Sequence, residues 1–367
     1  MTTYLPEDSE IDVHSLSKVF DDTTNSYKFY WFLAILDSLQ NTNDARLPMQ
    51  DLSLRMVATV WYPLDYYKLS FGAQDQLGNV ARFISTHLIV NTKANAPDLI
   101  SQLHAQLAEN ELVGVYRRVK ELLRWVPFRF IRPFFQLETK GMPDHQVNNA
   151  IVALANQSIK APYRFDSNAI VLNETWVRYF QRYQYILRGF INWHLIRYLQ
   201  KNNPNVPAIS EKLQRPVDRD FKMANPFWKT YLQHHPELTC IYSGQTITTD
   251  NISLDHYLPF SFVAHDQLWN LIPTTKSVNS AKNDWLPDKQ LYFDTYAQRQ
   301  YDAFQFYARK GENKKIEDYL ILFRASRETI EAEDFVSFRD RLRQAVQPQF
   351  ETALNMGFSY PFIYRPA

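Results

Sequence analysis

Asp255 and His256 are neighbours in the sequence, and two asparagines, Asn270 and Asn279, follow within the same short segment. Asp255 offers a carboxylate oxygen and Asn279 an amide oxygen, and a hard cation such as Mg²⁺ prefers oxygen ligands while keeping several waters. A neutral histidine has a pKa near neutrality, which makes it the natural general base for a water molecule. These groups can therefore hold one divalent metal and one activated water.

Phosphodiester hydrolysis is a reaction that needs such a set of groups. Water must lose a proton next to phosphorus, the charge of the transition state must be neutralised, and the leaving 3′-oxygen must be stabilised. We therefore expect metal-dependent cleavage of phosphodiester bonds, with Mg²⁺ as the cofactor and Mn²⁺ as an alternative.

The segment that carries these residues is predicted to form a β-hairpin, a loop and a short helix. Residues 240–247 place a Ser-Gly turn between β-branched residues, and residues 252–258 alternate with a period of two, so we expect the two stretches to pair. A short helix is predicted over 274–284. Neighbours on a strand point to opposite faces, so Asp255 can face the metal and His256 the water if the strand ends or bulges there.

This segment resembles the HNH (ββα-metal) endonuclease family, and most closely the HNH domain of the RNA-guided CRISPR effector nucleases. The positions that carry the resemblance are Asp255, His256, Pro259, Ser261, Phe262, Asn270, Asn279, Lys282 and Pro287. The resemblance implies that Asp255 and Asn279 bind the metal and that His256 is the general base. It also implies that Asn270 braces the loop presenting His256 and that Lys282 faces a phosphate. RNA guidance is not carried over, because the resemblance does not extend to the rest of the chain.

Other interpretations of the same residues remain open. Asp255 and His256 can be a strand-end pair that bonds to backbone, and Asn279 can cap a helix turn. Asn283 can replace Asn279 as a ligand. His265 fits a solvated loop residue, with a phosphate contact as the alternative. Cys240 is the only cysteine, so a zinc site built from cysteines is excluded and no structural zinc is expected.

Basic residues interleave with aromatic residues over 116–132, a composition that can follow a nucleic-acid backbone and stack bases. A solvated helix face whose aromatic side chains lie in the core is the alternative interpretation. The candidate nucleic-acid-binding residues are Arg117, Arg118, Lys120, Arg124, Arg129 and Arg132.

The composition limits the class of protein. Lys and Arg number 40 against 39 for Asp and Glu, so any nucleic-acid contact must come from local patches. The single cysteine suits a reducing cytoplasm, and the first residues show no signal peptide. Apolar runs are too short to cross a bilayer, so no membrane partner is expected.

The chain is long enough for two or three domains. Gly numbers only 8, and long amphipathic runs favour helices, so we expect a mainly α protein with a small α+β insert. We predict an all-α domain over 1–200, the nuclease domain over 201–290 and a helical region over 291–367. Helices are predicted near 25–40, 48–62, 75–91, 97–110, 112–125, 143–160, 173–202, 288–310, 314–324 and 331–346.

Together these features predict a cytoplasmic HNH endonuclease that acts on DNA, with RNA as an open alternative. One such site cuts one strand, so a double-strand break needs dimerisation or two nicks. The helical regions would bind substrate or a partner, as in an anti-phage defence or restriction-type effector, acting as a homo-oligomer or with a partner defence protein. The alternatives are a phage or mobile-element nicking nuclease and a nucleic-acid-binding scaffold with an inactive HNH fold.

Overall fold

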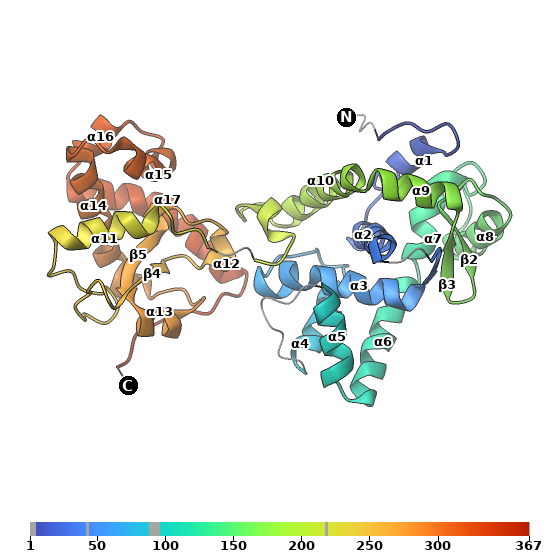
Figure 1. Cartoon of the computed structure of the whole chain (residues 1–367), viewed down its shortest axis with the longest axis horizontal. Coiled ribbons are helices and arrows are strands. Elements are labelled where there is room, and N and C mark those ends of the chain that lie inside the picture. Colours follow the sequence, from blue (N-terminus) through green and yellow to red (C-terminus); the bar gives the residue numbers. More distant parts are fainter. Residues whose placement is uncertain (1–4, 42–43, 88–95, 217–218, 367) are drawn as a thin grey trace. The chain divides into compact units, whose positions relative to one another are not determined.

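The computed structural model describes residues 5–41, 44–87, 96–216 and 219–366. The chain forms two compact units, Met1–Pro204 with Ile209–Pro216 and Asn205–Ala208 with Val217–Ala367 (Figure 1). Helices dominate both units and the sheets are small, which confirms the predicted class of a mainly α protein with a small α+β part. Among the residues described, none of the helices has the length and apolar character that a membrane span requires.

Most of the first unit is helical, and the predicted helix over 173–202 is two helices separated at Tyr183. Residues 88–91 of the helix predicted over 75–91 lie outside the described residues. The elements are α1 (Val13–Ser17), α2 (Tyr27–Asn41), α3 (Met49–Trp61), η1 (Tyr62–Tyr66), α4 (Leu77–Ser85), α5 (Ala96–Gln106), α6 (Glu109–Leu123), α7 (Val126–Ile131), η2 (Arg132–Phe135), α8 (Asp144–Asn156), α9 (Glu174–Arg182), α10 (Gln184–Asn202) and η3 (Ile209–Lys212).

Helix α2 forms the centre of this unit, with α3, α7, α9 and α10 packed around it (Figure 1). Every residue from Phe29 to Leu36 is buried, so the helix is apolar on all sides. A helix of that kind needs neighbours on every face. The unit is therefore organised around a helix that could be recognised from its sequence as a continuous apolar run.

A three-stranded antiparallel sheet also belongs to the first unit, so the expectation of an all-α domain over 1–200 is wrong. Its strands are β1 (Arg46–Pro48), β2 (Tyr163–Asp166) and β3 (Ala169–Leu172), in the order β1-β3-β2. Strands of three and four residues are too short to establish a period of two. The turn between β2 and β3 contains Ser167 at a φ of 52°, a conformation that the sequence does not signal with a glycine.

In the second unit, helices pack around a two-stranded sheet. Its elements are α11 (Ala224–His234), β4 (Ile252–His256), α12 (Phe260–Val263), η4 (Leu268–Asn270), β5 (Leu271–Thr275), α13 (Lys276–Lys282), α14 (Lys289–Arg309), α15 (Asn313–Phe323), α16 (Arg327–Glu331) and α17 (Phe335–Asn355).

One hydrophobic core runs through the whole second unit, from α11 to the C-terminal segment. Tyr257, next to β4, stacks on Tyr296 of α14 with ring centroids 3.9 Å apart. Gln300 of α14 donates a hydrogen bond of 2.9 Å to the carbonyl of Leu271 in β5. The predicted segments 201–290 and 291–367 are therefore not separate compact units, because α14 supplies the core beneath the sheet.

Strand β4 pairs antiparallel with β5, so the expected hairpin between 240–247 and 252–258 is wrong. Residues 240–247 close a turn of their own: Gly244 N–H donates to the Cys240 carbonyl at 2.9 Å, and Cys240 N–H donates to the Gln245 carbonyl at 2.8 Å. Because these backbone groups bond locally, β4 takes its partner from after the loop. The arrangement is still two strands followed by a helix, but the strand that pairs with β4 is β5 instead of residues 240–247.

Candidate active site

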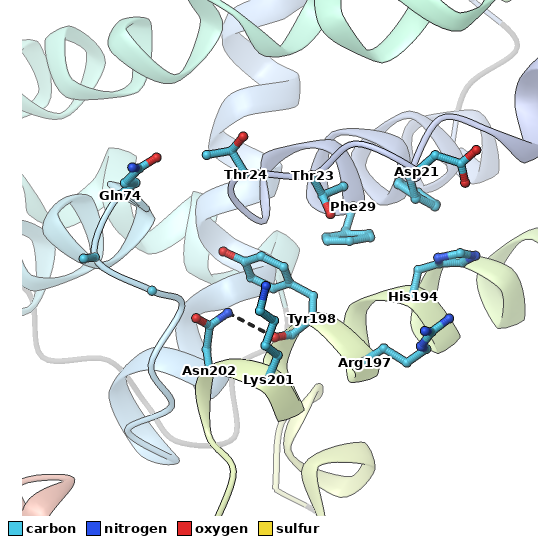
Figure 2. A pocket seen from close by; sticks show the side chains of 13 residues that line it. Asp21, Thr23, Thr24, Phe29, Gln74, His194, Arg197, Tyr198, Lys201 and Asn202 are labelled. Atoms are coloured by element: carbon cyan, nitrogen blue, oxygen red, sulfur yellow. Dashed lines mark hydrogen bonds between the residues drawn. The ribbon is translucent and has the colours of Figure 1, made fainter.

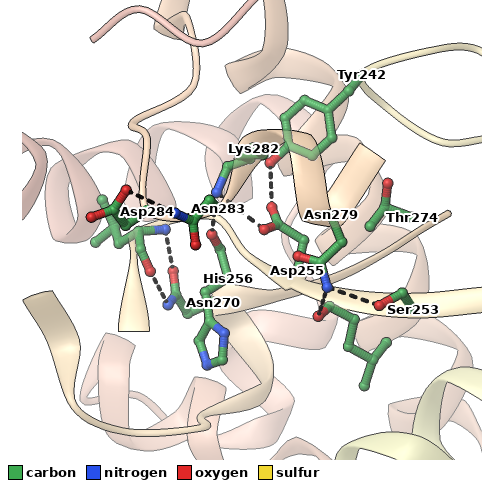
Figure 3. Close-up of polar contacts among 12 residues, drawn as sticks. Tyr242, Ser253, Asp255, His256, Asn270, Thr274, Asn279, Lys282, Asn283 and Asp284 are labelled. Carbon is green, nitrogen blue, oxygen red and sulfur yellow. Dashed lines mark hydrogen bonds and ion pairs between the residues drawn. The ribbon is translucent and has the colours of Figure 1, made fainter. Parts of the chain in front are cut away.

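Asp255 is buried in β4, with 2% of its surface exposed, and both of its carboxylate oxygens accept hydrogen bonds (Figure 3). The Tyr242 hydroxyl donates to Oδ2 at 2.8 Å, and Lys282 Nζ donates to Oδ1 at 3.1 Å. Burial and the Asp255 charge raise the pKa of Tyr242 far above its usual range, so the phenol stays a neutral donor. Asp255 is therefore held by one neutral and one charged partner.

Lys282, the last residue of α13, has no exposed surface. Its ammonium also donates a hydrogen bond of 2.7 Å to the His256 carbonyl. Burial lowers the pKa of Lys282, and the Asp255 carboxylate opposes that shift. The structure shows Lys282 as the buried counter-ion of Asp255, and the phosphate contact indicated by the sequence stays a prediction.

His256 ends β4, and its Nε2 lies 2.8 Å from Oδ1 of Asp266. The imidazole is 3% exposed, and the rings of Phe221 and Phe260 lie beside it. Burial lowers the pKa of His256, and the hydrogen bond to Asp266 opposes this shift without reversing it. The imidazole is thus held neutral, which is the form that can accept a proton.

Asp266 fixes which imidazole nitrogen carries the hydrogen. Burial would raise the pKa of Asp266, but the bonds from His256 and from the Asp220 N–H, which lies 2.8 Å from Oδ2, outweigh burial and lower it. An ionised carboxylate only accepts hydrogen bonds, so we assign the hydrogen to Nε2 of His256. Nδ1 then keeps the lone pair. The sequence analysis did not identify Asp266. The only sequence feature that could have indicated it is a carboxylate in the loop between His256 and Asn270.

Asn279 lies on α13 and contacts the strand that carries Asp255. Its Nδ2 donates to the Ser253 hydroxyl at 2.8 Å and to the Leu254 carbonyl at 3.1 Å (Figure 3). Its Oδ1 accepts no hydrogen bond from the residues that the structure describes. The side chain is thus fixed through its nitrogen, while its oxygen remains available as a ligand.

Asn270, the last residue of η4 and next to the start of β5, is fully buried and bonds to the segment that follows His256. Its Nδ2 donates to the Leu258 carbonyl at 2.9 Å, and its Oδ1 accepts from the Leu258 N–H at 2.8 Å. Its own carbonyl accepts from the Tyr257 N–H at 2.8 Å. These three bonds tie the backbone after His256 to β5, an arrangement that a bracing residue requires.

The two alternative residues lie at the edge of this arrangement. Asn283 follows the end of α13 at a φ of 47°, is exposed, and donates a long hydrogen bond of 3.5 Å to Asp284. His265 accepts from the Gln267 N–H at 3.4 Å, and its ring lies beside Trp269. The backbone N–H of Asn283 donates to the Asn279 carbonyl at 2.9 Å, but no hydrogen bond among the described residues joins the side chain of either alternative residue to Asp255 or to the Asn279 amide.

The donor set fits a hard divalent cation and not a zinc cluster. Each carboxylate oxygen of Asp255 has a second lone pair beyond the one that accepts its hydrogen bond, and the amide oxygen of Asn279 is available. Cys240 is buried, with Sγ 3.0 Å from the Thr274 hydroxyl. In the part of the chain that the structure describes, no three His, Cys, Asp or Glu side chains come together as metal ligands.

The six basic candidates lie in the first unit and do not form one uniform surface. Arg118 packs over the Phe83 ring at 3.8 Å, and Arg129 pairs with Asp144 at 2.9 Å. Arg129 and Arg132 line one cavity of about 940 Å³, together with Trp125. The exposed candidates Arg117, Lys120 and Arg124 are not among the residues that line it.

Comparison with known proteins supports the assignment of this segment. Residues 240–287 match the family model described as HNH endonuclease. No curated protein and no solved structure matches the chain. The match covers the turn at Cys240, both strands of the sheet, the helix α13 and the residues between them, and it does not reach the level of a subfamily. Residues 240–287 therefore form a segment of the HNH endonuclease family.

Proposed function

We propose that the protein is a metal-dependent endonuclease that hydrolyses phosphodiester bonds of DNA, with His256 as the general base. One observation carries the proposal: Nε2 of the buried His256 imidazole lies 2.8 Å from Oδ1 of Asp266, an arrangement that leaves Nδ1 as the nitrogen to accept a proton. This nitrogen belongs to the residue next to Asp255, in a segment of a nuclease family.

In this mechanism His256 Nδ1 accepts a proton from water as the water oxygen attacks phosphorus. The bond between phosphorus and the 3′-oxygen breaks, and the leaving oxygen takes the electron pair. Asp266 holds the imidazole in the required tautomer and stabilises the imidazolium that forms. A positioned base of this kind contributes about 10²- to 10⁴-fold to a rate.

Asp255 and Asn279 are the residues that we propose hold the metal, and Mg²⁺ with Mn²⁺ as a substitute matches their oxygen ligands. When bound, the ion would stabilise charge on the leaving oxygen. Tyr242 and Lys282 hold the carboxylate of Asp255 in one orientation before any ion arrives. Asn270 keeps the backbone after His256 in place.

One site of this kind cuts one strand, so a double-strand break requires a homo-oligomer or two successive nicks. We place the chain among bacterial anti-phage or restriction-type effectors, alone or with a partner defence protein, on the basis of its class. A phage or mobile-element nickase has the same chemistry, and RNA is an alternative substrate. The cavity lined by Trp125, Arg129 and Arg132 supports nucleic-acid binding by the first unit.

Nicking of a supercoiled plasmid with Mg²⁺ or Mn²⁺ tests the proposal. We expect wild type to nick and His256→Ala to lose about 10²-fold or more of the rate. His265→Ala is the matched control, because it removes a histidine from the loop that follows β4. If wild type is inert on DNA and RNA with every divalent metal, the HNH segment is an inactive scaffold. If His256→Ala nicks as fast as wild type, the assigned base is wrong.

A further inference from the structure

A second cavity, of about 600 Å³, lies within the first unit, far along the sequence from the HNH segment. One wall is the C-terminal half of α10, with Arg197, Tyr198 and Lys201. The segment containing Thr23 and Thr24 lies opposite, and residues 72–74 close one side (Figure 2). A volume of this size is typical of sites for small molecules.

Two cations of this cavity, Arg197 and Lys201, form no ion pair with the described residues. Arg197 and Lys201 are one helical turn apart, so their side chains share a face of α10. Neither forms a hydrogen bond or an ion pair with a residue in the described part of the chain. Asp21 is the single carboxylate among the residues that line the cavity, so the net charge of the lining is positive. An anion is the ligand that this balance favours.

His194 lies one turn before Arg197 on the same helix and also lines the cavity. Its Nε2 is buried and makes no hydrogen bond to the described residues. Buried polar atoms are rarely left without a partner. Burial, followed by the Arg197 charge, lowers the pKa of His194, so the imidazole is neutral and can donate or accept. A polar ligand atom would complete this site.

The remaining lining supplies a polar side and an apolar floor. Thr23, Thr24 and Gln74 line the cavity across from α10, and the hydroxyl of Thr23 points toward that helix (Figure 2). Phe29 is buried beneath, with its ring centroid 5.6 Å from that of Tyr198. The Tyr198 hydroxyl donates to the Phe71 carbonyl at 2.6 Å, which fixes the ring. The cavity therefore combines a cationic end with a fixed aromatic surface.

We propose that this cavity binds a mononucleotide, whose phosphate lies between Arg197 and Lys201 and whose base packs toward Phe29 and Tyr198. The inference goes beyond the nuclease site, because every residue it uses belongs to the first unit. Thr23 and Thr24 also line the larger cavity with Arg129 and Arg132, so a phosphate at the end of a nucleic acid is a second source of the same chemistry. The experiment must distinguish the two.

Isothermal titration of the full chain in EDTA tests the proposal without nuclease turnover. The probes are the four ribonucleoside 5′-monophosphates, the corresponding nucleosides, inorganic phosphate and a 5′-phosphorylated hexanucleotide. We expect at least one monophosphate to bind, with its nucleoside and inorganic phosphate each at least about 10-fold weaker. Arg197→Ala/Lys201→Ala should weaken this binding by at least about 10-fold. Lys160→Ala/Arg164→Ala removes the same charge from exposed positions of the first unit outside the cavity and should leave it unchanged.

A third variant examines the base side of the cavity. Ala73→Trp places an indole at an exposed lining position and keeps both cations, so nucleotide affinity should fall while the weak affinity for phosphate remains. Circular dichroism establishes that each variant is folded. The proposal is overturned if no monophosphate binds wild type, or if only the hexanucleotide binds. Equal weakening by the Lys160→Ala/Arg164→Ala control pair would also overturn it, since binding would then reflect net charge.

Discussion

Nε2 of His256 lies 2.8 Å from Oδ1 of Asp266, ten residues further along the chain in the loop between the two strands. The carboxylate is itself fixed by the backbone N–H of Asp220 at 2.8 Å. The backbone at Asp220, before α11, thus orients Asp266, and Asp266 in turn orients the imidazole of His256. The proposed catalytic residue therefore depends on a contact that no residue spacing within the HNH segment reveals.

Asp266→Asn should lower kcat for plasmid nicking by about 10-fold or more, with KM little changed. An amide can present its NH₂ group to Nε2, which favours the tautomer with the hydrogen on Nδ1 and removes the acceptor for the water proton. Initial rates across plasmid concentrations separate kcat from KM. Asp220→Asn is the control, because Asp220 contacts Asp266 only through its backbone. An unchanged kcat in Asp266→Asn would show that the pair is only structural.

Lys282→Met should destabilise the metal-free protein by about 3 kcal/mol, because it leaves the buried Asp255 carboxylate without its cation. Mn²⁺ should restore more stability to this variant than to wild type, since the ion then supplies the missing charge. Urea unfolding with EDTA and with Mn²⁺ measures both effects. Lys276→Met, an exposed lysine on the same helix, is the control. Unchanged stability with a raised KM for DNA would instead identify Lys282 as a phosphate contact.

Asn270→Ala should cost about 2 kcal/mol or more of stability, because it leaves the buried N–H and carbonyl of Leu258 without partners. Nicking should fall as well, since the backbone after His256 loses its tie to β5. Chemical unfolding and nicking assays on the same preparation test the two effects together. Gln290→Ala, on an exposed turn of the same unit, should change neither. A stable but inactive Asn270→Ala would give the residue a direct role in chemistry.

Lys212 gives the first unit a predictable dependence on pH. Burial lowers the pKa of Lys212 to about 7. Between that value and its unfolded pKa of about 10.4 the unfolded chain holds a proton that the folded chain lacks, so stability should rise with pH by up to about 1.4 kcal/mol per unit. Urea unfolding from pH 6.5 to 9.5 measures the slope, which Lys212→Met should reduce and exposed Lys160→Met should keep. A flat wild-type profile would contradict the lowered pKa.

Local patterns in the sequence sufficed for most helices and singled out Asp255, His256, Asn270 and Asn279 as candidates, but they did not single out Asp266. The apolar run of α2 and the polar spacing from Asp255 to Asn279 are both short-range features. The strand pairing was not predictable in this way, because residues 240–247 satisfy their backbone in a local turn and β4 pairs with residues beyond a long loop. Buried ion pairs, such as Lys282 with Asp255, depend on tertiary packing and likewise cannot be predicted from the spacing of residues in the sequence.

The dependence of the β4–β5 sheet on α14 limits how this nuclease segment can be moved between proteins. Gln300 bonds to the Leu271 carbonyl, and Tyr296 both stacks on Tyr257 and donates to the Trp269 carbonyl. A graft that ends at residue 290 would leave those two carbonyls without partners and expose the face of Tyr257. A functional transfer of this segment to another protein, by recombination or by design, therefore has to include the β4–β5 sheet together with the helices that follow it.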